Sequence, residues 1–517
     1  MLTSQFRNKQ NSNYMKKLIQ TAGLLLMLLA IAGACSKESY EPNTNPNNGN
    51  SGNGSTDPTP AETISEEIKK ADEFAQNALD TYYLWNTTIA DDIKNKLAPS
   101  VCKDPITTVT EIRYKEDRWT QLFDDISVMQ ESVEGISTTH GMNLSVGRFT
   151  NTETFFFIVN LVYANSPAEK AGVKRGDIII SYNGGDINQS NLEDAYYGTR
   201  TASYGLGKWT DEGIEDMNQS VSLTPVKLYL DPVIISKTFD VNGKKVGYLM
   251  YDSFDLDSAE KLIQVCKQFK AEGVKELVLD LRYNGGGYVF TEELLASMLA
   301  PEANVTAGDL YQKEEFNSIL TNAWSKDDPD FNKTYFSFTH EFGSSSDKDY
   351  KKLSTQGANI GLNKIYAIVS SNTASASESL LVGLNPFMDV ETIGKQTHGK
   401  FCTGYILGVN NVYEKVPSVI SKWGIYVMVG TYSDKDGKNM ARPNGITPGT
   451  AAEDTPWEGY DLGDENESML KAALKAAGKT YAETRSLETR PRLDLLPMHN
   501  KYKFGKRIMN RPFESFR

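Results

Sequence analysis

The stretch from Lys364 to Lys400 constrains the fold more than any other part of this 517-residue chain. Its first part, Ile365 to Val369, is a short apolar run bounded by polar turn residues, which predicts a buried strand. Small residues from Ser370 to Ser379 lead into an apolar helical segment, and Val390 to Ile393 predicts a second strand. A strand, a tight turn, a helix and a further strand in succession indicate an α/β fold.

The turn in this stretch presents a serine at the start of a helix. Ser375 is followed by helix N-terminal amides, among them that of Ala376, which have no partner within the helix. A hydroxyl beside such donors has the layout of an acyl-transfer nucleophile with its oxyanion pocket. Lys400 closes the next loop, and burial in an apolar site lowers the pKa of a lysine enough for it to act as a base.

The residues alone leave other interpretations open. The same small residues can form an ordinary helix start, with Lys400 a solvated loop charge. His398 is a more usual base than lysine, and the Cys402 thiol is an alternative nucleophile to Ser375. We interpret His398 as a residue that lines the site.

The sequence TASASE, followed by GKQTHGK, resembles the active-site motifs of the tail-specific (C-terminal-processing) serine proteases. The resemblance implies that Ser375 is the nucleophile and Lys400 the general base, and the two residues have the spacing of that family. The family often places a glutamine four residues after the lysine to orient it, where this chain has Gly404. Another group must therefore hold Lys400, and Thr403 or a backbone carbonyl is expected to do so.

A glycine-rich turn follows the strand predicted over Glu276–Leu281. It lacks the lysine and hydroxyl residue of a phosphate-binding P-loop. The sequence LDLRYNGGG instead resembles the LDLRxNxGG motif of the same proteases. Carried over, the resemblance implies that the Gly287 amide donates to the oxyanion, with the Ala376 amide as its partner.

A second recognisable segment begins at Ser166. The sequence SPAEKAGVKRGDIIISYNGGDI resembles the end of the PDZ domain found in these proteases. The resemblance implies a carboxylate-binding loop at His140–Leu144, with Gly141, Met142 and Leu144 as peptide-binding residues. In such domains a peptide adds a strand to the sheet edge. The alternative is a PDZ-like packing module without a ligand.

The fold expected from these features is α/β: a ββα-repeat (ClpP/crotonase-like) protease core, a small PDZ-like β-rich domain and a short N-terminal helical region. Residues 302–361 are polar and resemble an insertion more than a core element. The predicted segments are a lipoprotein signal peptide (1–34), a flexible tether (35–61), the helical region (62–135), the PDZ-like domain (136–232), the protease core (233–480) and a C-terminal tail (481–517).

The first residues have the features of a targeting segment. Met15-Lys16-Lys17 supplies a positive start before the apolar run Leu18–Ile31, and Ala-Gly-Ala then precedes Cys35. This resembles a bacterial lipoprotein box and implies that Cys35 is lipidated. The chain is then expected in the cell envelope, anchored to the outer membrane on either face. Ordinary signal cleavage near Ala34 is the alternative.

The charge and composition exclude some classes of function. A net charge of −13 argues against a nucleic-acid partner, which requires a basic face. No pair of cysteines or histidines has metal-ligand spacing, so neither a metal nor another cofactor is implied. We therefore expect a serine endopeptidase whose partners are protein or peptide substrates and, through its lipid, a membrane. The alternative hypothesis is a catalytically inactive, PDZ-containing scaffold lipoprotein that binds peptides.

Overall fold

The computed structural model describes residues 64–149, 152–210, 213–345, 349–482, 494–496 and 505–509. The predicted signal peptide, the tether and Cys35 lie outside these residues. Within the described ranges, no helix is long and apolar enough to cross a membrane.

The described chain begins with a group of short helices. The first of them is capped by Ser65, whose Oγ accepts a hydrogen bond from the Ile68 amide at 3.2 Å. Its apolar stripe is buried, and Phe74 and Ala75 are fully inaccessible. The elements are α2 (Glu66–Tyr82), α3 (Ala90–Lys96), α4 (Pro105–Ile112), β1 (Gln121–Phe123) and α5 (Ser127–Val133).

A β-rich region follows and surrounds its own apolar cluster. Its main sheet has the strand order β23-β3-β4-β6-β5-β7-β8, while β2 pairs with β9. The elements are β2 (Ile136–Thr139), β3 (Met142–Arg148), β4 (Thr154–Val162), α6 (Pro167–Lys170), β5 (Ile178–Tyr182), β6 (Gly185–Asn188), α7 (Leu192–Tyr197), β7 (Ala202–Thr210), β8 (Gly213–Leu223), β9 (Val226–Tyr229) and, from the C-terminal segment, β23 (Asp494–Leu496).

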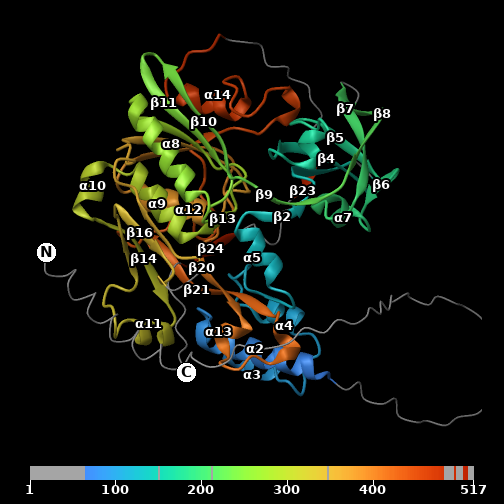
Figure 1. The fold of residues 1–517 in the computed structure, drawn as a ribbon, viewed down its shortest axis with the longest axis vertical. Coiled ribbons are helices and arrows are strands. Elements are labelled where there is room, and N and C mark those ends of the chain that lie inside the picture. The colour runs from blue at the N-terminus through green and yellow to red at the C-terminus, as the bar shows by residue number, and fades with distance from the viewer. Residues whose placement is uncertain are drawn as a thin grey trace, which may run out of the picture. The chain divides into compact units, whose positions relative to one another are not determined.

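A mostly parallel sheet forms the first layer of the remaining chain, as the alternation of strands and helices predicted (Figure 1). Its order is β10-β11-β12-β18-β19-β22, and β11, β12, β18 and β19 run parallel. The elements are β10 (Val233–Val241), β11 (Lys244–Tyr251), α8 (Ala259–Glu272), β12 (Glu276–Asp280), β18 (Lys364–Val369), α12 (Ala376–Leu384), β19 (Asp389–Gly394), β22 (Thr450–Ala451), η2 (Pro456–Glu458) and α14 (Ser468–Ala476).

A second sheet has the order β13-β24-β20-β21-β14-β15, and β1 pairs with β21. Its strands are β13 (Gly286–Tyr288), β24 (Lys506–Ile508), β20 (Cys402–Gly408), β21 (Gly424–Asp434), β14 (Leu310–Phe316) and β15 (Lys333–Tyr335). Around it lie α9 (Val289–Leu299), α10 (Glu302–Ala307), α11 (Ser318–Trp324), β16 (Thr339–Phe342), β17 (Lys351–Ser354), α13 (Val409–Val412) and η1 (Ser418–Ile420). Figure 1 shows β24, from the red end of the chain, beside β20.

The interpretation of residues 302–361 as an insertion was wrong for strands β14 and β15, which belong to the second sheet. Strand β14 pairs with β21 on one side and β15 on the other, inside the second sheet. Tyr311 and Gln312 are each 1% exposed. The prediction failed because the polar side chains of β14 are buried against partners that are distant in sequence.

Candidate active site

Ser375 lies where strand β18 passes into helix α12, with φ 66° and ψ −114°. This backbone conformation is uncommon for a residue with a side chain and costs about 1–3 kcal/mol. A strained strand-to-helix turn of this kind is typical of a catalytic nucleophile. Ser375 is fully buried, and its Oγ has no hydrogen-bond partner among the described residues.

Lys400 is also fully buried, with its ammonium group in an aromatic surrounding. Its Nζ donates to the Tyr426 hydroxyl and to the Gly505 carbonyl, both at 2.7 Å, and lies 5.6 Å from the ring centre of Trp119. Burial lowers the pKa of Lys400 well below its ordinary value, and the nearby charge of Lys506 lowers it further. A neutral amine has two N–H groups and one lone pair, so the two donated bonds leave the lone pair available for a proton.

Glu378 connects the turn of Ser375 to the loop of Lys400. Its Oε2 accepts the amides of Ser375 at 2.9 Å and Lys400 at 2.8 Å. Its Oε1 accepts the Gly399 amide at 2.7 Å and the Thr397 hydroxyl at 2.5 Å. Burial raises the pKa of Glu378 to about 7, although the four hydrogen bonds oppose the shift. One buried carboxyl group thus fixes the backbone of both predicted catalytic residues.

The glycines of β13 lie against the same turn. Gly286 has φ 106° and Gly287 has φ 148°, conformations that favour glycine. A Cβ on Gly287 would lie 2.3 Å from the Phe254 carbonyl oxygen, so a side chain does not fit. A Cβ on Gly286 would lie 2.9 Å from the Ser375 Cβ. The backbone of β13 therefore reaches the predicted nucleophile, and Ala376 is buried on the other side as the first residue of α12.

The alternatives within the Lys400 loop contact other groups. His398 Nε2 accepts a hydrogen bond from Trp119 Nε1 at 3.3 Å, and the two rings meet edge to face. Burial raises the pKa of the Cys402 thiol well above its ordinary value, which disfavours the thiolate needed for attack. Thr403 donates to Glu314 at 2.7 Å instead of holding Lys400. The lysine is held by Tyr426 and by a backbone carbonyl, the second of the expected possibilities.

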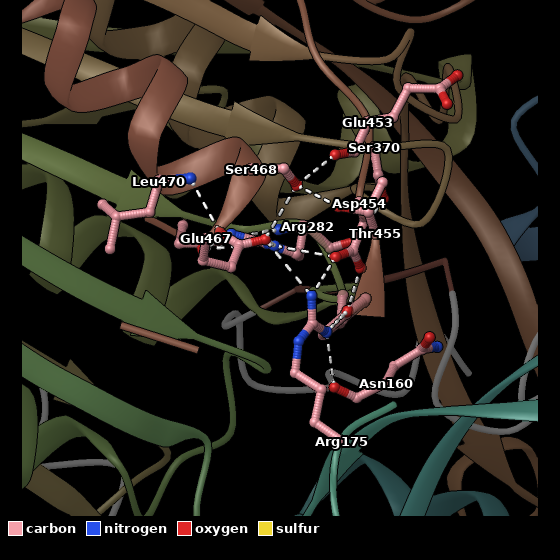
Figure 2. Close-up of polar contacts among 12 residues, drawn as sticks. Asn160, Arg175, Arg282, Ser370, Glu453, Asp454, Thr455, Glu467, Ser468 and Leu470 are labelled. Atoms are coloured by element: carbon pink, nitrogen blue, oxygen red, sulfur yellow. Dashed lines mark hydrogen bonds and ion pairs between the residues drawn. The ribbon is translucent and has the colours of Figure 1, made fainter. Parts of the chain in front are cut away.

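A buried ionic cluster lies just before the β13 glycines (Figure 2). Arg282 donates to Asp280 and Glu467, each at 2.7 Å, and Arg175 of the β-rich region donates to Asp454 at 2.5 Å. Burial raises the pKa of Asp454, but the charges of Arg175 and Arg282 outweigh it and hold the pKa below its usual range. This cluster joins the β-rich region to the strand that leads into the predicted oxyanion glycines.

The residues predicted to bind a peptide lie at the start of β3. Gly141 has φ 85°, and a Cβ there would lie 2.1 Å from the Ser166 Cβ. Met142 opens β3, and Leu144 is buried in the apolar cluster of the β-rich region. Strand β23 pairs antiparallel with the opposite end of β3, with Leu496 opposite Val146. Among the described residues there is no group of three or more side chains able to hold a metal ion.

A mostly parallel sheet, a strained serine at a helix start and an attached β-rich module together form the described architecture. Residues 245–451 match the model of peptidase family S41, and residues 158–197 match the model of the PDZ domain. The chain therefore carries an S41 peptidase domain together with a PDZ domain, and carboxyl-terminal-processing proteases are among its homologues.

Two curated relatives illustrate the similarity. The carboxyl-terminal-processing protease of Picosynechococcus sp. (strain ATCC 27264 / PCC 7002 / PR-6) is 29% identical over 175 residues, 33% of this chain and 41% of the relative. CtpB of Bacillus subtilis (strain 168), a carboxy-terminal processing protease, is 26% identical over 245 residues, 46% and 47% of the two chains. The chain thus spans about half the length of the curated relatives it matches.

A solved structure supports the fold over a longer range. A putative S41 protease from Bacteroides fragilis NCTC 9343 superposes with a TM-score of 0.60 at 22% identity. The match covers 78% of this chain and 96% of that chain.

Three residues at the site were not found from the sequence. Glu378 stands three residues after Ser375, which is the spacing of a helix-capping glutamate and is readable in the sequence. Tyr426 comes from β21, and Gly505 from the C-terminal segment, 105 residues after Lys400. No local pattern connects either of these two to the lysine.

Proposed function

We propose that the chain is a serine endopeptidase of the bacterial cell envelope, with Ser375 as nucleophile and Lys400 as general base. The observation that carries this proposal is the pairing of a strained, buried serine that has no hydrogen-bond partner among the described residues with a buried lysine of lowered pKa. Glu378 links their backbones.

In the first step Ser375 Oγ attacks the scissile carbonyl carbon, and its proton passes to neutral Lys400 Nζ. The tetrahedral oxyanion is stabilised by the Gly287 and Ala376 amides. As the intermediate collapses, the C–N bond breaks, and the Lys400 ammonium gives its proton to the departing amine. The acyl-enzyme on Ser375 is then hydrolysed by a water that neutral Lys400 deprotonates, and the serine is restored.

The PDZ domain is proposed to recognise or gate substrate C-termini through Gly141, Met142 and Leu144. Support comes from the position of these residues at the start of β3, an edge onto which a peptide strand can add.

The catalytic proposal is tested by digestion of an unstructured protein with the wild type, Ser375→Ala and Lys400→Arg. We expect both variants to lose at least about 10³-fold in activity, because one lacks the nucleophile and the other has a base that stays protonated. Ser377→Ala is the matched control, since its hydroxyl donates to the Asn284 carbonyl at 3.1 Å and has no proposed catalytic role. Full cleavage by folded Ser375→Ala would place the nucleophile elsewhere.

We also propose that Cys35 carries a lipid that anchors the protein to the outer membrane. The Ala-Gly-Ala-Cys sequence after an apolar run supports this assignment. Cells fed a labelled fatty acid should incorporate it into the wild type and not into Cys35→Ser. Equal labelling of both proteins would contradict the anchor, and Cys102→Ser, which alters a buried free cysteine, serves as the control.

A further inference from the structure

Strand β24 of the C-terminal segment fills the space between the glycine strand β13 and strand β20 (Figure 1). It pairs in parallel with β13, with Gly286 opposite Lys506 and Gly287 opposite Arg507. On its other side the Met509 amide donates to the Gly404 carbonyl at 3.0 Å. An extended segment held along strand edges by main-chain hydrogen bonds is how many proteins bind a peptide.

The Lys506 carbonyl lies at the predicted nucleophile. A Cβ on Gly286 would lie 2.2 Å from the Lys506 oxygen and 2.9 Å from the Ser375 Cβ, so both atoms approach the same point. The Lys506 amide donates to the Gly285 carbonyl at 3.1 Å. In a parallel ladder of this register the Gly287 amide is directed at the Lys506 carbonyl. The carbonyl thus meets the predicted oxyanion donor.

Arg507 enters a pocket built for a guanidinium group. It donates to Glu292 at 2.9 Å, to Glu314 at 2.6 Å and to the Gln312 side-chain oxygen at 3.0 Å. Its guanidinium carbon lies 4.7 Å from the ring centre of Tyr432. The arginine is 1% exposed, so these charge-assisted bonds form away from water. Carboxylates in a fork arrangement beside an aromatic face select arginine over lysine.

The same C-terminal segment also covers the PDZ sheet edge. Strand β23 adds antiparallel to β3, and Leu496 packs against the apolar cluster that includes Leu144 and Val146. Two segments of one chain therefore lie on the two strand edges where a serine peptidase with a PDZ domain would bind a peptide.

We propose that β24 is a tethered ligand of the catalytic groove, and that the groove selects extended peptides with an arginine in the pocket of Glu292, Gln312 and Glu314. This inference rests on the proposed function and names its substrate class. The wild type is the restrained form, because Lys400 Nζ donates to the Gly505 carbonyl of the tethered segment and Lys506 occupies the site at Ser375. Displacement of β24 opens the groove to a substrate strand.

The first test displaces β24 in the full chain. Lys506→Pro removes the amide that donates to Gly285, together with the side-chain charge near Lys400, and leaves β13, β20 and the pocket of Arg507 unchanged in sequence. We expect this variant to react with a fluorophosphonate at Ser375 at least about tenfold faster than the wild type. Ala482→Pro is the control, since Ala482 is exposed and outside the regular elements. A folded Lys506→Pro that reacts no faster would overturn the proposal.

The second test measures binding without catalysis. A labelled peptide with the sequence of residues 503–511 is titrated into Lys506→Pro and into the wild type, each carrying Ser375→Ala. We expect at least about tenfold tighter binding to Lys506→Pro, and at least about tenfold weaker binding of a peptide with glutamate at position 507. Equal affinities in either comparison would overturn the inference. The proposed function would not be affected by that result, because the digestion experiment tests it separately.

If Lys506→Pro does not fold, hydrogen exchange of the wild type can test whether β24 is a releasable ligand or a permanent core strand. A tethered ligand releases locally, so peptides covering residues 505–509 are expected to exchange at least about tenfold faster than those covering β21. Exchange of both at the same slow rate would make β24 a permanent core strand and overturn the proposal.

Discussion

At the scale of single residues, the proposed chemistry depends on two buried ionisable groups. Lys400 is surrounded by Tyr426, Trp119 and the Gly505 carbonyl, and the nearest opposite charges do not offset its burial. A lysine in this setting is neutral at a pH where a solvated lysine is charged. Its proposed role as a base therefore depends on its burial, because a charged lysine in the same loop could not accept a proton from Ser375.

Glu378 is the second such group and acts as a positioning residue. Replacing it with glutamine turns one acceptor oxygen into a donor that faces the Gly399 or Lys400 amide. We expect Glu378→Gln to lower kcat by about 10- to 100-fold and to lower stability by about 1–3 kcal/mol. Glu378→Asp should restore part of kcat, and Glu260→Gln, an exposed change on α8, should leave it unchanged.

The pH profile separates positioning from plain destabilisation. Because the pKa of Glu378 is about 7, its acceptor form is lost as the pH falls through 7, and wild-type activity should fall with it. The acid limb assigned to Glu378 should be absent from the Glu378→Gln profile. An unchanged limb in that variant would exclude the role.

At the scale of elements, the sequence predicted those helices and strands whose position depends on a local apolar pattern. Strand β18, helix α12 and strand β19 follow the apolar pattern around Ser375. Strand β24 was not predicted, because residues 481–517 were assigned only as a C-terminal tail. Arg507 is buried only because Glu292 of α9 and Glu314 of β14 converge on it.

The same limit explains the partial prediction of the site. The serine, the lysine and the glycine turn each lie in a recognisable local sequence motif, so their residues could be predicted. The groups that contact Lys400 (Tyr426 and Gly505) and the pocket of Arg507 are brought together only by the folded sheet. A buried polar network of this kind has no periodicity to read.

At the scale of the whole molecule, the ionic cluster of Figure 2 joins the PDZ domain to the peptidase domain. Arg175 is 5% exposed and balances Asp454 beside Tyr283. Arg175→Met would leave three carboxylates facing Arg282 alone. We expect a loss of about 3 kcal/mol, measured as a lower midpoint of thermal unfolding.

Lys174→Met is the matched control for this prediction, because Lys174 is the exposed neighbour of Arg175. Its free energy of unfolding should stay within about 0.5 kcal/mol of that of the wild type. Equal midpoints for the two variants would show that the cluster does not hold the domains together.

Neutral Lys400 is proposed to activate Ser375, and covalent labelling of the serine measures this activation. The rate of fluorophosphonate reaction would be measured from pH 6 to 10 in wild type and Lys400→Ala, each with and without Lys506→Pro, and the modified residue identified by mass spectrometry. We predict modification of Ser375 at a rate that rises with pH, reaches a plateau well below the ordinary pKa of lysine and falls at least about 100-fold in Lys400→Ala. Labelling of another residue, or Lys400→Ala reacting at the wild-type rate, would contradict the account.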